Sequence, residues 1–149
     1  GPNGVAIIVE TMTDNKNRTA SDMRIATNKK GGTIASPGSV AFNFDRKGVI
    51  QIFKESYEEN KLFNLASDLG ADDFDAMDEF YIVVTAPDKL YKIKEGLEQN
   101  GVTCSEYSLE MIPKNFICCG EEEKKANQDL INWLENLDDV DSVFHNMSD

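Results

Sequence analysis

Cysteine, histidine and long apolar runs are scarce in this sequence. Among 149 residues there are three cysteines, Cys104, Cys118 and Cys119, and one histidine, His145. The cysteines form neither the spaced pairs of a disulfide framework nor a Cys-x-x-Cys metal motif, so we expect buried, reduced thiols and no metal site. No apolar run approaches the roughly 18 to 20 residues needed to cross a bilayer, and no signal peptide opens the chain. We therefore expect a cytoplasmic protein that makes no membrane contact.

Basic residues are also in short supply. Fifteen lysines and arginines stand against 27 aspartates and glutamates, so the formal net charge is −12. Such a charge argues against binding a polyanion over the whole surface. The deficit is uneven, because the segment through Lys54 has eight basic and four acidic residues and the remainder is strongly acidic. This asymmetry indicates either two surfaces with different partners or helix faces that are simply solvated.

Motifs of the common enzyme classes are missing as well. The chain has no glycine-rich phosphate loop, no Gly-x-Ser-x-Gly elbow and no His-Glu-x-x-His motif. Cys118 and Cys119 could form a thiolate pair near His145, but cysteines buried in a central strand are inert more often than reactive. The acidic run at 72–79 lacks the glycine turn and distal glutamate of an EF-hand loop, which favours a solvated edge strand over a cation site. We predict no enzyme activity, catalytic residue, cofactor or metal.

The sequence does contain a regular succession of strand and helix patterns. With 40% hydrophobic residues, it has enough apolar side chains for a core. Apolar or alternating runs predict strands, and apolar residues at helical spacing between capping residues and glycines predict helices. The predicted strands are 5–11, 39–44, 49–53, 80–85, 102–112, 116–119 and 140–147, with 72–78 as an edge strand or loop. The predicted helices are 19–30, 56–69, 87–100 and 121–136.

The order of these elements predicts one domain inserted in another. Removing the middle six elements leaves strand-helix-strand-strand-helix-strand, and the removed part has the same order. We predict an α+β fold of two ferredoxin-like (βαββαβ) domains, in which residues 1–46 together with 114–149 form a discontinuous domain and residues 47–113 form an acidic insertion. The expected central strands are 5–11 with 116–119, and 49–53 with 80–85. The alternative is two tandem α+β domains divided near Glu55.

A group of cations around the first predicted helix is the candidate nucleic-acid site. We call it the basic strip, and its members are Lys16, Arg18, Arg24, Lys29, Lys30, Arg46 and Lys47. The turn at 15–18 joins cations to free backbone amides at a helix start, which suits a phosphate group. A structural explanation competes, because Lys29 and Lys30 complement a helix C-terminus and Arg46 and Lys47 fall in an expected solvated turn. The aromatic signature of RNA-recognition domains is absent from 79–85 and 116–119, which disfavours RNA binding by the sheets.

Several blocks of the sequence resemble a known family. They are GPNGVAIIVE, TDNKNRTASDMR, NKKGG, GSVAFNFDRKGVI, EMIPKN and NLDDVDSVFHN. Nearly end to end, the chain resembles the second and third domains of the YebC/PmpR family of gene-expression regulators. The resemblance implies a three-domain protein whose third domain is inserted in the second. Nothing here matches the basic, helical N-terminal domain of that family, so the chain resembles a fragment of such a protein.

The resemblance implies a function other than catalysis. DNA-binding transcriptional regulation is the form that the family description favours, and the alternative is a ribosome-associated translation factor or translational activator. The implied partners are DNA or rRNA, bound through the basic strip and the N-terminal domain. The acidic residues of the insertion themselves indicate a ribosomal or other basic protein as a further partner. A third hypothesis, a small-molecule sensor, follows from the ability of paired ferredoxin-like domains to bind ligands between sheets.

Overall fold

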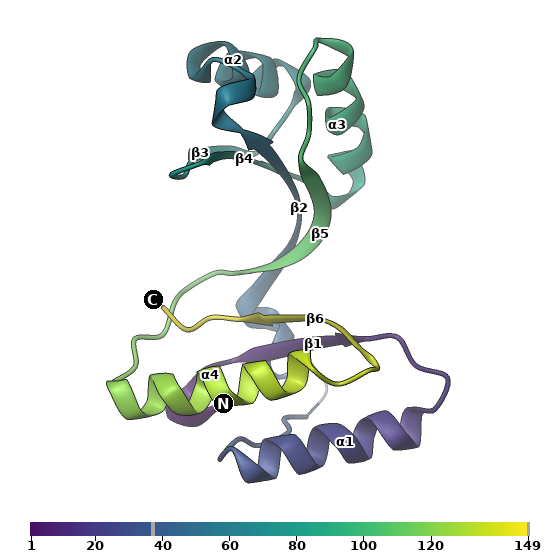
Figure 1. The fold of residues 1–149 in the computed structure, drawn as a ribbon, viewed down its shortest axis with the longest axis vertical. Coiled ribbons are helices and arrows are strands. Elements are labelled where there is room, and N and C mark those ends of the chain that lie inside the picture. Colours follow the sequence, from purple (N-terminus) through teal and green to yellow (C-terminus); the bar gives the residue numbers. More distant parts are fainter. Residues whose placement is uncertain (37, 149) are drawn as a thin grey trace. The chain divides into compact units, whose positions relative to one another are not determined.

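The computed structural model describes residues 1–36 and 38–148 and contains two compact units (Figure 1). One unit combines Gly1–Asp45 with Ile112–Asp149, and we call it the split unit. The other is Arg46–Met111, which we call the insert unit. Pro37 and Asp149, which the predicted discontinuous domain includes, lie outside the described residues. No helix in the described part of the chain is long and apolar enough to span a membrane.

The insert unit has the strand order expected of a ferredoxin-like fold. Along the chain, its elements are β2 (Phe44–Phe53), α2 (Glu59–Leu69), β3 (Asp73–Ala76), β4 (Phe80–Thr85), α3 (Leu90–Gln99) and β5 (Glu106–Pro113). The sheet order is β3-β4-β2-β5, and β4 pairs antiparallel with both β2 and β3. The first and third strands of the unit are therefore central, as predicted from their apolar composition.

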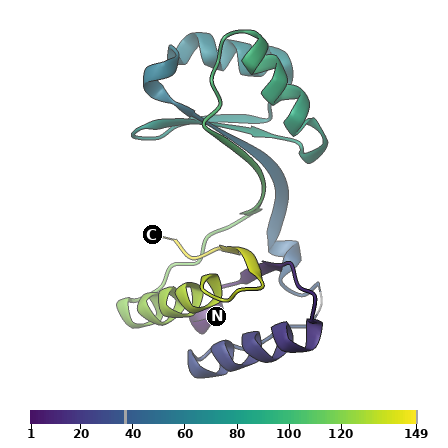
Figure 2. The ribbon, with the colours of Figure 1, turned by 45° about the vertical axis from the view of Figure 1, so that its right-hand side comes forward.

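Alternation along the two central strands builds the core of the insert unit. Ile50 and Ile52 on β2 and Val83 on β4 are fully buried on the same face. Both helices lie on this side of the sheet, as Figure 2 shows, and Leu62 of α2 and Leu97 of α3 pack into the cluster. The apolar faces of α2 and α3 thus pack against the apolar side of the two central strands, and both helices cover the same face of the sheet.

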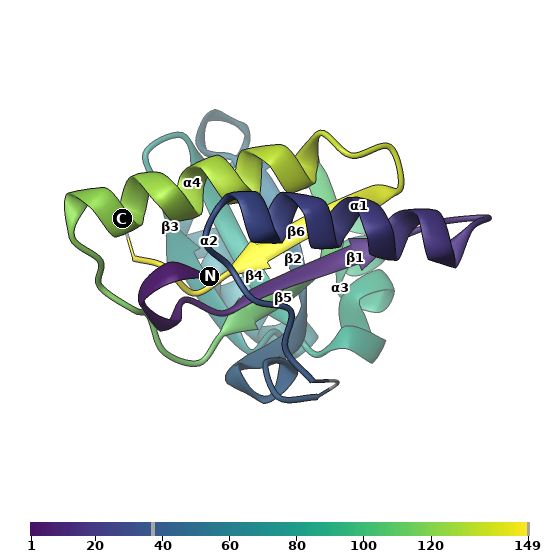
Figure 3. The same ribbon diagram turned by 90° about the horizontal axis from the view of Figure 1, so that it is seen from below.

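The split unit is a smaller antiparallel arrangement. Its strands β1 (Ile7–Thr11) and β6 (Val140–His145) pair antiparallel, and its helices are α1 (Lys16–Lys29) and α4 (Glu121–Glu135). The two helices lie side by side over one face of the β1–β6 sheet (Figure 3). Ala26, Leu130 and Leu134 form the centre of the layer between helices and strands. The α+β class with two antiparallel sheets is confirmed, and it is consistent with two ferredoxin-like units.

The predicted strand at 39–44 and the turn after it are wrong. Ala41–Asn43 is a short 3-10 helix, and β2 then runs without a turn through Arg46 and Lys47 to Phe53. Gly48, at the end of the turn expected between 44 and 49, is needed for close packing. A Cβ atom there would lie 2.3 Å from Thr85 Oγ1 and 2.8 Å from Leu90 Cβ, so the position admits only glycine without displacement.

The predicted central strand at 116–119 is also wrong. Only Ile117 makes a β-bridge, and its partner is Met147. The N–H of Ile117 donates to the carbonyl of Asn146 at 2.7 Å, while the N–H of Asn146 donates to the carbonyl of Ala6 at 3.2 Å. Asn146 therefore lies between the two segments, and its buried side chain fixes this order by accepting the N–H of Ala6 at 2.8 Å. Ile117 therefore pairs its backbone with residues 146–148, and the ladder expected between 116–119 and 5–11 does not form.

The cysteines agree with part of the sequence prediction. All three are free, but Cys118 is exposed and Cys104 and Cys119 are only partly buried, so the expectation of buried thiols is wrong for Cys118. Burial raises the pKa of the Cys104 thiol to about 11. A thiol with so high a pKa is protonated at neutral pH and is a poor nucleophile.

Candidate nucleic-acid interface

The first helix begins three residues earlier than predicted. Asn15 is its N-cap, and the side-chain oxygen of Asn15 accepts the N–H of Arg18 at 3.0 Å. The residue expected to start the helix, Thr19, instead lies within it and is 5% exposed. The Asn15 side chain thus satisfies one of the free amides at the helix start, which is the role of an N-cap residue. Lys16 is consequently the first residue of α1.

The guanidinium of Arg18 forms ion pairs with two carboxylates of the split unit. Its Nη2 lies 2.8 Å from Asp139 Oδ1, its Nε lies 3.1 Å from Asp139 Oδ2, and a second ion pair joins it to Asp14 at 3.0 Å. Such a bidentate contact is the geometry in which arginine binds a carboxylate most strongly. The hydrogen bonds from Arg18 and then Thr19 hold the pKa of Asp139 below its usual value, and Asp139 in turn raises the pKa of Arg18.

Two threonines complete this contact. The hydroxyl of Thr19 donates to Asp139 Oδ2 at 2.7 Å, and the hydroxyls of Thr19 and Thr13 are also 2.7 Å apart. Asp139 lies between α4 and β6, and only 12% of its side chain is exposed. We call Thr13, Arg18, Thr19 and Asp139 the α1 anchor. Its function is to fix the start of α1 to the segment that follows α4, so the charge of Arg18 is already neutralised within the chain.

Lys16 and Arg24 are differently placed. Both are exposed on α1, and within residues 1–36 and 38–148 no ion pair is recorded for either of them. Cations without a carboxylate partner keep their full electrostatic attraction for an anion. Among the predicted strip residues of the split unit, these two are therefore better suited to a phosphate than Arg18.

The end of α1 brings two cations to an aromatic ring. The Nζ atoms of Lys29 and Lys30 lie 5.8 and 5.7 Å from the centroid of the Trp133 ring on α4. Both distances fall within the range of a cation–π contact. The apolar spacing along 121–136 predicts a core position for Trp133, whereas its side chain is only partly buried, at the edge of the cluster formed by Ala26, Leu130 and Leu134. Lysines and a partly exposed indole thus occur together at this end of α1.

Arg46 and Lys47 belong to the insert unit, where they form part of β2 and not of a hairpin turn. Lys47 Nζ makes an ion pair with Asp72 Oδ2 at 2.9 Å. The structure therefore places five residues of the basic strip on or directly after α1 and two on a strand of the other unit. The use of these seven residues as one binding surface stays a prediction.

The α1 anchor was missed by sequence analysis because its members are far apart in the chain. Arg18 and Asp139 are separated by 121 positions, and nothing in the local spacing of either indicates the other. The DNKNRT block does contain the capping asparagine and the arginine, but a structural and a phosphate-binding role predict the same residue types.

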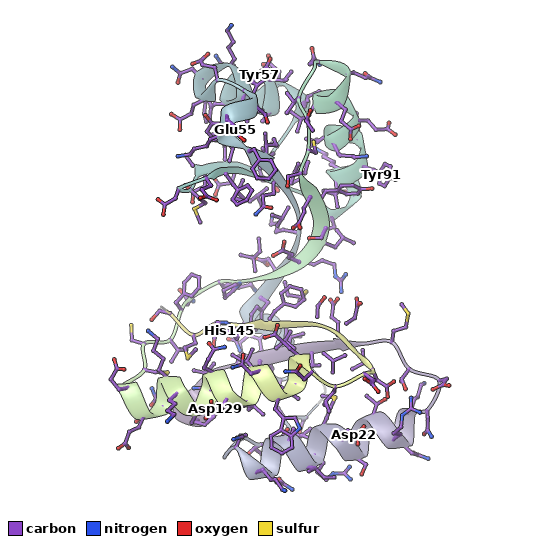
Figure 4. The ribbon with its side chains drawn as sticks, in the orientation of Figure 1. Asp22, Glu55, Tyr57, Tyr91, Asp129 and His145 are labelled. Atoms are coloured by element: carbon purple, nitrogen blue, oxygen red, sulfur yellow. The ribbon has the colours of Figure 1, made fainter. Side chains whose placement is uncertain are left out.

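His145, the single histidine, lies at the end of β6 (Figure 4). Its Nδ1 accepts the N–H of Met147 at 3.1 Å, as expected for a structural histidine. In the described part of the chain, no group of three or more His, Cys, Asp or Glu side chains could hold a metal ion. The acidic run contains the short edge strand β3, in which Asp73 and Asp75 are exposed.

Fold and charge together define a two-unit α+β protein with an acidic ferredoxin-like insert and a split unit whose first helix carries exposed cations. The chain belongs to the TACO1/YebC family, because the model of that family's second and third domain matches residues 1–147. The predicted resemblance is thereby confirmed.

Individual relatives are similar over almost the whole chain. A probable transcriptional regulatory protein of Protochlamydia amoebophila (strain UWE25) is 52% identical over 147 residues, which cover 99% of this chain and 60% of the relative. A protein with the same description from Chlamydia trachomatis serovar L2 is 52% identical, with 99% and 63% covered. A crystal structure of a conserved hypothetical protein from Aquifex aeolicus has a TM-score of 0.89 at 36% identity, covering 99% of this chain and 61% of that one. The chain thus spans about three-fifths of the length of these relatives.

Proposed function

We propose that the protein containing this chain is a regulator of transcription that binds DNA in the cytoplasm and catalyses no reaction. The observation that carries the proposal is the family match over residues 1–147, together with relatives described as probable transcriptional regulatory proteins. The exposed cations of α1 support it, because phosphate contacts supply most of the affinity of a DNA-binding surface.

The contact surface that we propose on this chain is narrower than the basic strip. It consists of Lys16 and Arg24 on α1 and the pair Lys29 and Lys30 beside Trp133. Arg18 is left out because Asp139 and Asp14 neutralise it. With a net charge of −12, the remaining surface repels nucleic acid, so contact through this chain is confined to a few cations.

Charge reversal on α1 tests this surface. The double variant Lys16→Glu and Arg24→Glu should weaken binding of the complete protein to DNA roughly tenfold and reduce the salt slope of log K by about 0.9 for each phosphate that the variant no longer binds. The measurement is a fluorescence anisotropy titration at several salt concentrations. The matched control is Lys61→Glu with Lys92→Glu, two exposed lysines of the insert unit, which changes net charge equally. Equal effects of the two double variants would show that only net charge matters and would reject the surface.

The nucleic acid bound in cells decides between transcription and translation. We expect crosslinking and sequencing of the complete protein to recover promoter DNA. Recovery of rRNA with no DNA enrichment would replace the proposed transcriptional function with that of a ribosome-associated translation factor. Lys16→Glu with Arg24→Glu should lower the recovered signal in either case, which separates the location of the surface from the identity of its ligand.

A further inference from the structure

The sheet of the insert unit has a second face that no element of this unit covers. Both α2 and α3 lie on the side of Ile50, Ile52 and Val83 (Figure 2). Because side chains alternate along a strand, their neighbours on the central strands point to the other side. We call this side the open face, and its central residues are Val49, Gln51 and Phe53 on β2 and Phe80, Ile82 and Val84 on β4.

An apolar stripe runs along the open face. The register pairs Val49 with Val84, Gln51 with Ile82, and Phe53 with Phe80. The two phenylalanine rings, 4.9 Å apart between centroids, form one end of the stripe, and 42% of Phe53 is exposed. Five of these six side chains are apolar and none is fully buried. Aromatic and branched side chains that remain accessible on a sheet are typical of a surface that binds a partner.

Acidic side chains border the stripe along β3. Asp73 is paired with Val84 and Asp75 with Ile82, so both carboxylates leave the strand on the side of the open face, and both are exposed. Asp78 and Glu79 follow in the exposed turn that leads to Phe80. No lysine or arginine occurs from residue 62 to 88, the span that includes all of β3 and β4. The apolar stripe therefore has a negative border on this side.

The opposite edge, β5, is acidic on the same face. The ring of Tyr107 on β5 makes an edge contact with the ring of Tyr91 on α3, which is labelled in Figure 4. The centroid of the Tyr107 ring lies 4.5 Å from Lys94 Nζ, so Tyr107 points to the helix side. By alternation, Glu106 and Glu110 point to the open face. The lysines of α2 and α3 are in the helix layer, and they are Lys61, Lys92 and Lys94. By the same alternation, Lys47 of β2 also points to the open face, where it is paired with Asp72 at 2.9 Å. Apart from this paired lysine, the central and edge strands present carboxylates on both sides of the apolar stripe.

The edge of the sheet is less suited to binding than its face. The carboxylate of Asp73 accepts the N–H of Phe74 at 2.8 Å, and that of Asp75 accepts the N–H of Ala76 at 2.9 Å. These local hydrogen bonds occupy two donors of the edge strand β3 that an added strand would need. A partner is therefore expected to lie across the open face and contact side chains.

We propose that the open face binds a lysine- and arginine-rich segment of another protein that also carries aliphatic or aromatic side chains. The apolar stripe buries the apolar residues of such a segment, and the carboxylates on β3 and β5 pair with its cations. Nucleic acid is disfavoured by the same carboxylates. A second copy of this chain would bring like charges to the contact, which costs free energy at every acidic position.

The test uses the 149-residue chain and a short fluorescent peptide in which lysine alternates with leucine or phenylalanine. Binding should weaken progressively with salt, and amide chemical-shift changes should map to Val49, Ile82 and Val84. Asp73→Asn with Asp75→Asn should weaken binding about threefold to tenfold, since each exposed charge pair is worth little alone. Gln51→Lys, which places a cation within the stripe without removing a core side chain, should weaken binding at least as much.

Matched controls make the outcome decisive. Asp68→Asn with Glu95→Gln removes the same charge from the exposed helix layer and should leave the affinity unchanged. A peptide with serine in place of every apolar residue should bind at least about tenfold more weakly, because it has nothing to bury against the stripe. The proposal is rejected if both double variants act alike, if shift changes map to α2 and α3, or if an oligonucleotide binds the open face as tightly. Self-association that competes with the peptide would reject it in favour of a second copy.

Discussion

At the scale of single residues, the same kind of side chain has different functions in neighbouring positions. Arg18 and Arg24 are less than two helical turns apart on α1, yet Arg18 is paired with two carboxylates and Arg24 has no recorded ion pair among the described residues. The difference comes from Asp139, which reaches Arg18 from a distant part of the chain. A cation in a sequence motif is therefore evidence for a phosphate site only after its internal partners are known.

Asp139→Asn should lower the thermal stability of the chain at neutral pH, because it removes the carboxylate that accepts hydrogen bonds from Arg18 and Thr19. The pKa of Asp139 is lowered from its ordinary value of 3.8, so its stabilising contribution is present above that pH and is lost as the pH falls through the lower folded-state value. Melting curves at several pH values should show the variant and the parent converging in acid.

The neighbouring Asp138 supplies the control for this prediction. Asp138 is exposed and has no recorded hydrogen bond or ion pair in the described residues, so Asp138→Asn removes the same charge without touching the α1 anchor. Its melting temperature should stay close to that of the parent throughout. Equal melting temperatures for the two variants at neutral pH would show that the anchor contributes nothing to stability.

At the scale of elements, the two ends of α1 have separate functions. Its N-terminal end is fixed by Asn15 and the α1 anchor, whereas its C-terminal end carries Lys29 and Lys30 near Trp133. The helix C-terminus favours cations, so part of the interaction of these lysines is with the helix itself. The remaining charge is available at a partly exposed ring, where a nucleotide base or phosphate can approach.

Trp133 is the only tryptophan in the chain and reports on this end of α1. We expect DNA binding to change its fluorescence, because a phosphate that attracts Lys29 and Lys30 alters the cation–π contacts with the ring. Titration of the complete protein should use selective labelling of this tryptophan if others are present. In the variant Lys29→Ala with Lys30→Ala, the change should be much smaller. An undiminished change in that variant would place the DNA contact elsewhere.

At the scale of the whole molecule, the net charge of −12 is the sum of two different surfaces. The insert unit has seven basic and fourteen acidic residues, and the first helix of the split unit carries its cations close together. We propose that the two units are domains, with boundaries close to the predicted 1–46 with 114–149 and 47–113. The ten apolar or small buried residues of the insert cluster form one core, which is the first requirement for independent folding.

Independent folding of the units gives this proposal its test. Leu97→Ala, in the core of the insert unit, should destabilise that unit by about 2 to 5 kcal/mol. Hydrogen exchange in the full chain should then speed up across β2, β4 and α3 and remain unchanged across β1, β6 and α4. The converse variant, Leu134→Ala, should affect only the split unit. If hydrogen exchange became faster in both units of either variant, the chain would unfold as one cooperative body.

Much of the fold follows from local patterns in the sequence. The helices, the strands of the insert unit and its apolar central pair were all predictable, because a side chain's spacing along a helix or strand decides which face it can bury. The family could be identified from the same linear information, since blocks such as TDNKNRTASDMR are contiguous. The exposed cations of α1 were recognisable as candidates for the same reason.

Contacts between distant segments decided the rest. The continuous β2 depends on the packing of Gly48 against Thr85 and Leu90, and the middle position of Asn146 depends on its hydrogen bond to Ala6. The pairing of Arg18 with Asp139 belongs to the same class. Each of these contacts is decided by which groups meet when the chain closes on itself, and local spacing carries no information about that meeting. Residue types and their periods were therefore determined by the sequence alone, whereas the availability of each charge was decided by the tertiary structure.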